Sequence, residues 1–190
     1  MANLNIQNIV FAFFVFGFAG WFMESIQESI VRKRFVSKGF FKGPFVPCQG
    51  FGGLGVVIIA YPFKAHPVAV FFGGIIICTV IEYITAIFLE KCFKVKCWDY
   101  TTYPHTSWCH FQGRICLTIS LFFGIITLFI LYVFWDLIMF VIQNLGNRIW
   151  IVDGVMLFLF LADIIFTCTK IIKNNKAGIK IKGFAVFSKE

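Results

Sequence analysis

Five apolar runs, each about as long as a membrane-spanning helix, dominate this sequence. They cover about residues 8–30, 45–63, 67–89, 115–142 and 149–170. A helix needs about 20 mostly apolar residues to cross the hydrocarbon core of a bilayer. With 59% hydrophobic and 14% charged residues, a soluble domain of 190 residues could not bury so much apolar surface. The pattern predicts an all-α fold, a polytopic membrane helical bundle of five transmembrane helices, in a multi-pass protein of the cell membrane.

The distribution of basic residues predicts the orientation of these helices. Of the 17 Lys and Arg residues, 15 follow the first or third run or lie in or after the end of the fifth. The alternate side holds only Lys64 and Arg148. By the positive-inside rule, the amino terminus lies outside and the carboxyl terminus in the cytosol. We expect a transmembrane domain over residues 1–170 and a basic cytosolic tail over 171–190. The net charge of +8 then needs no nucleic-acid partner.

A glycine-rich stretch in the second run matches the dinucleotide-binding pattern G-x-G-x-x-G at Gly50, Gly52 and Gly55. That pattern binds a pyrophosphate only where it follows a buried strand and opens a helix. No strand is predicted before Gly50, so we expect no nucleotide. Small residues allow helices to pack closely in a membrane. We predict this role for Gly50, Gly52, Gly53 and Gly55. The alternative is that the segment lines a cavity.

Several carboxylates interrupt the apolar runs, and such residues are candidates for function because they are costly in lipid. Glu24, Glu82 and Asp163 lie on three different helices at roughly the same depth, about 10 Å from the cytosolic interface at 1.5 Å per residue. Glu28 and Asp136 lie near helix ends and can reach headgroups or water. A polar stripe on the first helix contains Trp21, Glu24, Ser25 and Glu28.

These observations predict a polar chamber open to the cytosol. Its walls would include Glu24 and Glu82, with Arg34 or Arg114 near its mouth. The structural alternative is that the acids are protonated, or pair with these arginines to hold the bundle together.

The loop of residues 90–114 is rich in aromatic residues, and Asp99 stands in it between Trp98 and Tyr100. Cysteines and histidines in the same loop raise the question of a zinc site: Cys92, Cys97, Cys109, His105 and His110. No paired C-x-x-C occurs, so we predict no metal. In the predicted topology six of the seven cysteines lie at the cytosolic face, where thiols are kept reduced, and we expect no disulfide framework.

Several short motifs between Phe14 and Gly124 carry a resemblance to one family. They are Gly20-Trp21 with Glu24, Gly39-Phe40-Phe41, Gly43-Pro44 with Pro47, Gly50-Phe51-Gly52, Glu82-Tyr83, Trp98-Asp99-Tyr100 and Gly113-Arg114-Ile115-Cys116-Leu117. On these the chain resembles the CmpB-like bacterial membrane proteins described as putative type IV ABC-transporter permeases. It departs from the family pattern at Gln49, where a tyrosine is usual, and at His110, where an asparagine is usual. The resemblance implies a permease-like protein and supplies no substrate.

Three functions stay open at this point. The first is a permease-like transporter subunit, whose cavity would be lined by Glu24, Glu82, Asp99, Arg114, Arg34, Trp21, Gln49, Trp98 and His110. The chain contains no G-x-x-x-x-G-K-[ST] loop, so we expect any ATPase to be a separate subunit. Five helices are few for a complete pathway, which favours a homodimer or a heteromeric complex. The second is an intramembrane enzyme that acts on a lipid or isoprenoid headgroup, with a carboxylate as base and an arginine on phosphate. The third is a non-catalytic membrane partner or sensor. None of the three requires a cofactor.

Overall fold

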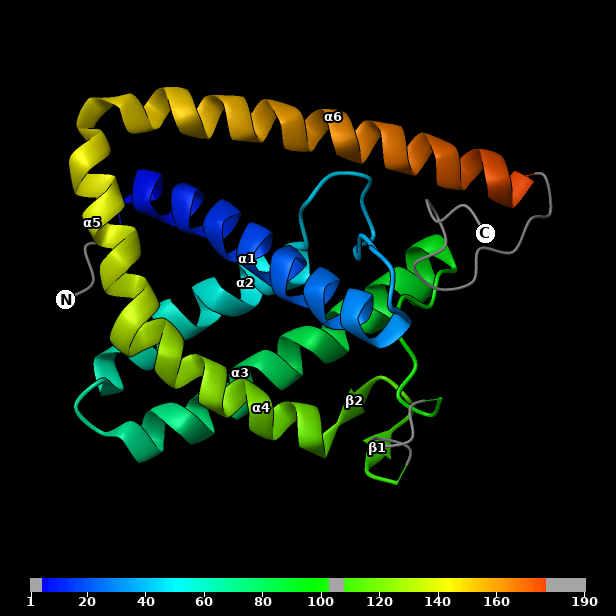
Figure 1. The fold of residues 1–190 in the computed structure, drawn as a ribbon, viewed down its shortest axis with the longest axis horizontal. Coiled ribbons are helices and arrows are strands. Elements are labelled where there is room, and N and C mark those ends of the chain that lie inside the picture. The colour runs from blue at the N-terminus through cyan, green and yellow to red at the C-terminus, as the bar shows by residue number, and fades with distance from the viewer. Residues whose placement is uncertain (1–4, 103–107, 177–190) are drawn as a thin grey trace.

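The computed structural model describes residues 5–102 and 108–176, which form a bundle of helices with one small hairpin (Figure 1). The elements are α1 (Ile6–Arg32), α2 (Pro47–Gly55), the π-helical turn η1 (Val56–Ala60), the 3-10 turn η2 (Tyr61–Phe63), α3 (Pro67–Phe88), the π-helical turn η3 (Leu89–Phe93), strands β1 (His110–Phe111) and β2 (Ile115–Cys116), α4 (Leu117–Phe129), the π-helical turn η4 (Ile130–Phe134), α5 (Trp135–Leu145), the 3-10 turn η5 (Gly146–Arg148) and α6 (Ile149–Lys176). The predicted helical fold is confirmed. The two-residue strands, which pair antiparallel, were not predicted.

The helices overlap all five apolar runs. Three stretches are long and apolar enough to cross a membrane: Ile6–Ile30, Pro67–Phe93 and Leu117–Lys173, with a shorter apolar helix at Pro47–Phe63. The third stretch is 57 residues long. The chain turns sharply within it, between α5 and α6 (Figure 1).

Local sequence explains several helix boundaries. Pro47 and Pro67 begin α2 and α3, where a missing backbone N–H costs nothing because the first amides of a helix have no partner inside it. Lys33 ends α1 with a left-handed backbone at φ 51°, and Lys94 ends η3 in the same way at φ 54°. The loops that follow both residues turn back onto the bundle.

Helix α1 packs mainly against α2, and α3 packs mainly against α4. The main core lies where α1, η1, α3 and the α4–α5 segment meet, and Val56, Val70, Leu131 and Trp135 are buried there. A second set of contacts brings in α6, because the Phe160 ring lies 4.8 Å from the Phe45 ring.

Three of the four glycines predicted for packing lie at close contacts between helices. A Cβ atom on Gly50 would come within 2.8 Å of the Phe13 ring of α1, and one on Gly55 within 2.9 Å of Ile77 of α3. Gly53 faces the Phe16 ring. A Cβ atom on Gly52 would meet no atom within 4 Å among the described residues. The close helix contacts of this segment are therefore made at Gly50, Gly53 and Gly55.

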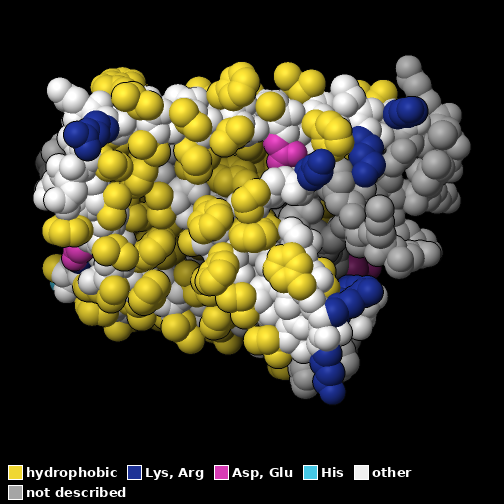
Figure 2. All heavy atoms as spheres, turned by 45° about the horizontal axis from the view of Figure 1, so that its top comes forward, with side chains coloured by type: hydrophobic (Ala, Val, Ile, Leu, Met, Phe, Trp, Pro, Cys, Tyr) yellow, Lys and Arg dark blue, Asp and Glu magenta, His cyan; other side chains and the backbone are white. Residues whose placement is uncertain are grey.

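The outer surface is strongly apolar. Hydrophobic side chains cover most of the face shown in Figure 2, while Lys and Arg gather mainly toward one end. Large apolar side chains such as Phe158 (71% exposed), Ile76 and Phe140 point outward along the helices. In water such a surface would aggregate, whereas lipid tails solvate it.

Candidate functional site

Two carboxylates from different helices belong to one polar cluster inside the bundle. Glu24 of α1 accepts a hydrogen bond from Nε2 of Gln49 of α2 at 2.8 Å. Glu82 of α3, which is 7% exposed, accepts one from the hydroxyl group of Tyr100 at 2.7 Å. The two carboxyl groups interact electrostatically with each other. Thus the structure pairs Glu24 with Gln49 and Glu82 with Tyr100, and the two pairs are near enough for the charges of their carboxyl groups to interact.

One oxygen of this cluster is unsatisfied. Oε2 of Glu82 is buried and has no hydrogen-bond partner among the described residues. A buried polar atom without a partner is costly and calls for an explanation, such as a bound ion or proton. The positive charge that acts on Glu24 comes from Lys38, whose Nζ lies 3.2 Å from Oε2 of Glu28.

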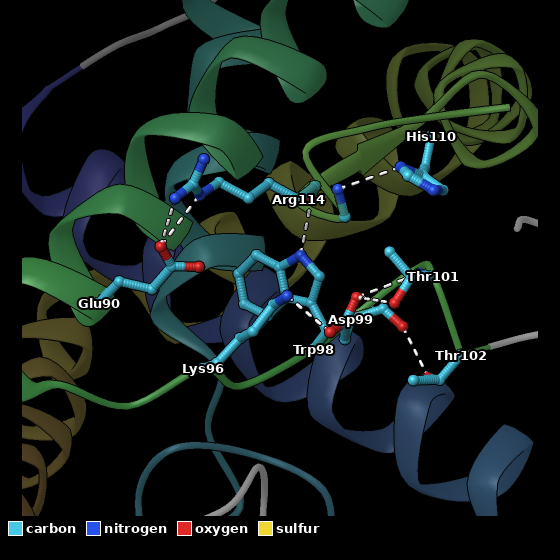
Figure 3. A network of polar contacts seen from close by, with 9 residues as sticks. Glu90, Lys96, Trp98, Asp99, Thr101, Thr102, His110 and Arg114 are labelled. Atoms are coloured by element: carbon cyan, nitrogen blue, oxygen red, sulfur yellow. Dashed lines mark hydrogen bonds and ion pairs between the residues drawn. The ribbon is translucent and has the colours of Figure 1, made fainter.

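Tyr100 reaches Glu82 because its loop is fixed to the β1–β2 hairpin. The Tyr100 amide donates to the Gly113 carbonyl at 3.0 Å. The Trp98 indole donates to the Arg114 carbonyl at 2.8 Å (Figure 3). Burial and the neighbouring Glu82 carboxylate raise the pKa of Tyr100. The phenol therefore keeps its proton and acts as the donor.

Asp99 organises the same loop from its exposed side. Its carboxylate accepts from Lys96 at 2.6 Å and from the amide and hydroxyl group of Thr101 at 3.1 and 2.7 Å (Figure 3). Partial burial alone would raise the pKa of Asp99, but the hydrogen bonds from Lys96 and Thr101 outweigh it and lower the pKa to about 2. The same carboxylate faces Gly113, where an added Cβ would lie 2.6 Å from Oδ1. Asp99 therefore holds the loop and does not contact Glu24 or Glu82.

Arg114, which was predicted to lie near the mouth of the chamber, pairs with Glu90 instead. Its guanidinium donates two hydrogen bonds to Oε2 of Glu90, at 2.6 and 3.0 Å (Figure 3). It donates a third to Gln112. Nδ1 of His110 accepts from the Gly113 amide at 3.2 Å, within the hairpin turn. Arg34 is exposed on the loop after α1. The structure thus pairs Arg114 with residues other than Glu24 and Glu82 and leaves Arg34 on the exposed loop.

Most of the predicted stripe on α1 binds the loop that follows that helix. The Trp21 indole donates to Ser37 at 3.1 Å, and the Ser25 hydroxyl group accepts from the Lys38 amide at 3.0 Å. Glu28 pairs with Arg32 at 2.5 Å as well as with Lys38. These residues have structural partners, and Glu24 is the member of the stripe that faces the interior cluster.

The remaining acids have separate environments. Asp163 of α6 accepts from the amides of Lys42 and Gly43, at 3.2 and 2.8 Å, and so ties this loop to α6. Asp136 is exposed and lies 3.4 Å from Nζ of Lys64. Asp163, which was predicted at the same depth as Glu24 and Glu82, therefore binds the loop after α1.

Sequence reasoning missed two residues. Tyr100 belongs to the Trp98-Asp99-Tyr100 motif, in which only Trp98 and Asp99 were predicted as site residues. Asp153 lies in the apolar start of α6, is 6% exposed, and has no hydrogen-bond partner for either oxygen among the described residues. A lone carboxylate between apolar residues was the available signal.

One of the Cys and His residues considered for a zinc site lies outside the described structure. His105 lies there, as does the part of the predicted tail beyond Lys176. Within residues 5–102 and 108–176, no three His, Cys, Asp or Glu side chains come together to hold a metal ion.

The apolar surface, the long apolar helices and the carboxylates buried between them define a membrane protein with a polar interior cluster. The sequence model of the family described as "Putative ABC-transporter type IV" matches residues 11–168, and the chain belongs to this family. The match includes every residue of the cluster, and it makes the chain a transporter-related membrane protein. No curated protein and no solved structure matches the chain.

Proposed function

We propose that this chain is the permease-like subunit of a transporter and that Glu24 and Glu82 bind a cationic ligand, of which the proton is the smallest case. The observation that carries the proposal is Oε2 of Glu82, which has no hydrogen-bond partner among residues 5–102 and 108–176, in a cluster that also contains the Glu24 carboxylate. Two acids with one shared environment attract positive charge, and acids inside membrane helices commonly mark ion pathways.

The proposal includes a topology. Five helical segments cross the cell membrane, with the amino terminus outside and the basic tail in the cytosol. The sharp turn between α5 and α6 and the gathering of Lys and Arg at one end of the molecule support this arrangement (Figures 1 and 2). Cysteine labelling that placed residues 170–190 outside the cell would overturn it.

We prefer a transporter to an intramembrane enzyme acting on a lipid or isoprenoid headgroup because of the pairing of Arg114. In the enzyme alternative an arginine would bind the phosphate group close to a carboxylate base, but the Arg114 guanidinium is held by Glu90, and Arg34 is exposed on the loop after α1. The chain carries no P-loop, so a separate ATPase subunit would supply ATP drive. A homodimer would add helices to the pathway.

Flux in proteoliposomes tests the proposal. Vesicles holding the purified protein and a dye selective for the ion under test are given gradients of H⁺, Na⁺, K⁺ and Mg²⁺ in turn. We expect flux of at least one of these cations above that of protein-free vesicles. Glu24→Gln and Glu82→Gln should each abolish it, because an amide oxygen can still accept from Gln49 or Tyr100 but carries no charge.

Asp136→Asn is the matched control, since Asp136 is an exposed acid on α5 away from the cluster. It should leave flux unchanged and, like the other two variants, keep the yield of folded protein. Unchanged flux in Glu24→Gln and Glu82→Gln, combined with loss of folded protein in Glu24→Ala, would mean that the acids are structural.

A further inference from the structure

Two cysteines meet at the base of the β1–β2 hairpin. Sγ of Cys109 and Sγ of Cys116 are 2.9 Å apart. The hairpin brings them together because it pairs His110 with Cys116 and because the Leu117 amide donates to the Cys109 carbonyl at 3.0 Å. A disulfide bond is about 2.05 Å long, so the sulfurs need to approach by less than about 1 Å to join.

The two thiols differ in accessibility. Cys116 is 1% exposed, whereas Cys109 is partly exposed and lies 3.3 Å from the Thr118 hydroxyl group. Hydrogen bonds with Cys116, which have the larger effect, and with Thr118 lower the pKa of Cys109. A hollow of about 280 Å³ opens beside them and is lined by both cysteines, His110, Ser120 and apolar neighbours. A small reagent can therefore reach Cys109 first, with Cys116 directly behind it.

The hairpin between these cysteines is also the support of the polar cluster. Its Gly113 and Arg114 carbonyls accept from the Tyr100 amide and the Trp98 indole, and Tyr100 in turn donates to Glu82. Anything that limits opening of the hairpin therefore limits departure of Tyr100 from Glu82.

We propose that Cys109 and Cys116 form a reversible disulfide by exchange with a low-molecular-weight disulfide such as oxidised glutathione, and that this bond holds Tyr100 on Glu82. The Cys109 thiolate attacks the small disulfide, forms a mixed disulfide and releases one small thiolate. The Cys116 thiolate then attacks Sγ of Cys109 and releases the second. Two protein thiols are oxidised, one small disulfide is reduced, and the two thiol protons pass to the released small thiolates.

The proposed orientation makes this bond a switch. It places the hairpin at the cytosolic end, where the thiol pool is reducing, so the bond would form only transiently. The inference goes beyond the proposed transport function. Its test measures thiols and backbone amides, so it succeeds or fails independently of any flux measurement.

The first experiment identifies the bond. The purified protein in detergent micelles is equilibrated with glutathione buffers of increasing oxidised fraction, blocked with an alkylating reagent, and digested without reduction for mass spectrometry. We expect a peptide pair linked by Cys109 and Cys116. The exposed thiol of Cys92 is the internal control and should show only a mixed disulfide with glutathione.

The variant Cys116→Ser separates the two steps. It leaves Cys109 without a second thiol, so the mixed disulfide should accumulate there. In the wild type, alkylation of both cysteines under oxidising conditions, or a mixed disulfide that persists at Cys109, would overturn the proposal.

The second experiment tests the coupling to Tyr100. Hydrogen exchange of the Tyr100 amide should slow several-fold in the oxidised protein and recover on reduction. Exchange that is unchanged or faster after oxidation would contradict the link to Glu82.

Discussion

The Tyr100 hydroxyl group donates to Oε1 of Glu82 over 2.7 Å and thereby connects a loop outside the helices to a carboxylate within α3. This contact depends on the β1–β2 hairpin, which holds Tyr100 through the Gly113 carbonyl. The loop between α3 and α4 therefore forms part of the candidate site, because it satisfies Oε1 of Glu82, while Oε2 has no hydrogen-bond partner among the described residues.

Removing the Tyr100 hydroxyl group should destabilise the folded protein. Tyr100→Phe leaves Oε1 of Glu82 buried without its donor, at a cost of about 1–3 kcal/mol. The fall in thermal unfolding temperature, measured in one detergent, checks this expectation. Tyr83→Phe is the matched control, because the Tyr83 hydroxyl group donates to exposed Gln112 at 3.2 Å and its loss should have little effect. Equal shifts in the two variants would contradict the role of Tyr100.

Two neighbouring glycines should respond differently to the same change. Gly53→Ala forces a methyl group into the Phe16 ring and should cost about 1–3 kcal/mol through overpacking. Gly52→Ala adds the same group where no described atom lies within 4 Å and should be tolerated. Folded yield and unfolding temperature measure both variants. Saturable nucleotide binding by the wild type, lost in Gly52→Ala without loss of folding, would instead favour a phosphate-binding loop.

Asp163 should hold the loop after α1 in place. Asp163→Ala removes the acceptor for the amides of Lys42 and Gly43, so both amides should exchange faster with solvent and the loop should be cut sooner by protease. Asp136→Ala removes an exposed acid and serves as the control. Unchanged exchange at both amides in Asp163→Ala would show that other contacts hold the loop.

The Asp99 turn should lose its hydrogen bonds only in strong acid. The pKa of Asp99 lies at about 2, below the ordinary value of 3.8. A lowered pKa means that the carboxylate stabilises the loop above about pH 4 and that this contribution disappears as the pH falls toward 2. The carboxyl carbon shift of Asp99 in NMR should titrate near pH 2 and move toward 3.8 in Lys96→Gln. A wild-type midpoint near 4 would contradict the contacts described here.

The helices could be predicted from the sequence because lipid imposes a simple rule. Each apolar run must satisfy its backbone internally, so length and hydropathy alone indicate a helix. Glu24 and Glu82 could be predicted as a pair because the sequence places them at roughly the same depth in the membrane, and residues at one level on adjacent helices can meet.

The partners of these residues could not be predicted in the same way. Tyr100 reaches Glu82 through a hairpin whose strands have two residues each, too short to leave a periodic pattern. Arg114 and Asp99 close the same loop, which suggested that they act together. The folded loop instead gives each a nearer partner, Glu90 and Lys96. Charge alone does not show which of several neighbours a side chain will face.

A double-mutant cycle on cation flux tests the central claim most directly. Flux is measured in proteoliposomes for the wild type, Glu24→Gln, Glu82→Gln and the double variant, with equal amounts of folded protein. If the two acids form one site, the double variant loses no more flux than the more severe single variant, because either change already removes the site. Partial losses in the single variants that multiply in the double variant, or full flux in either single variant, would contradict a shared cation site.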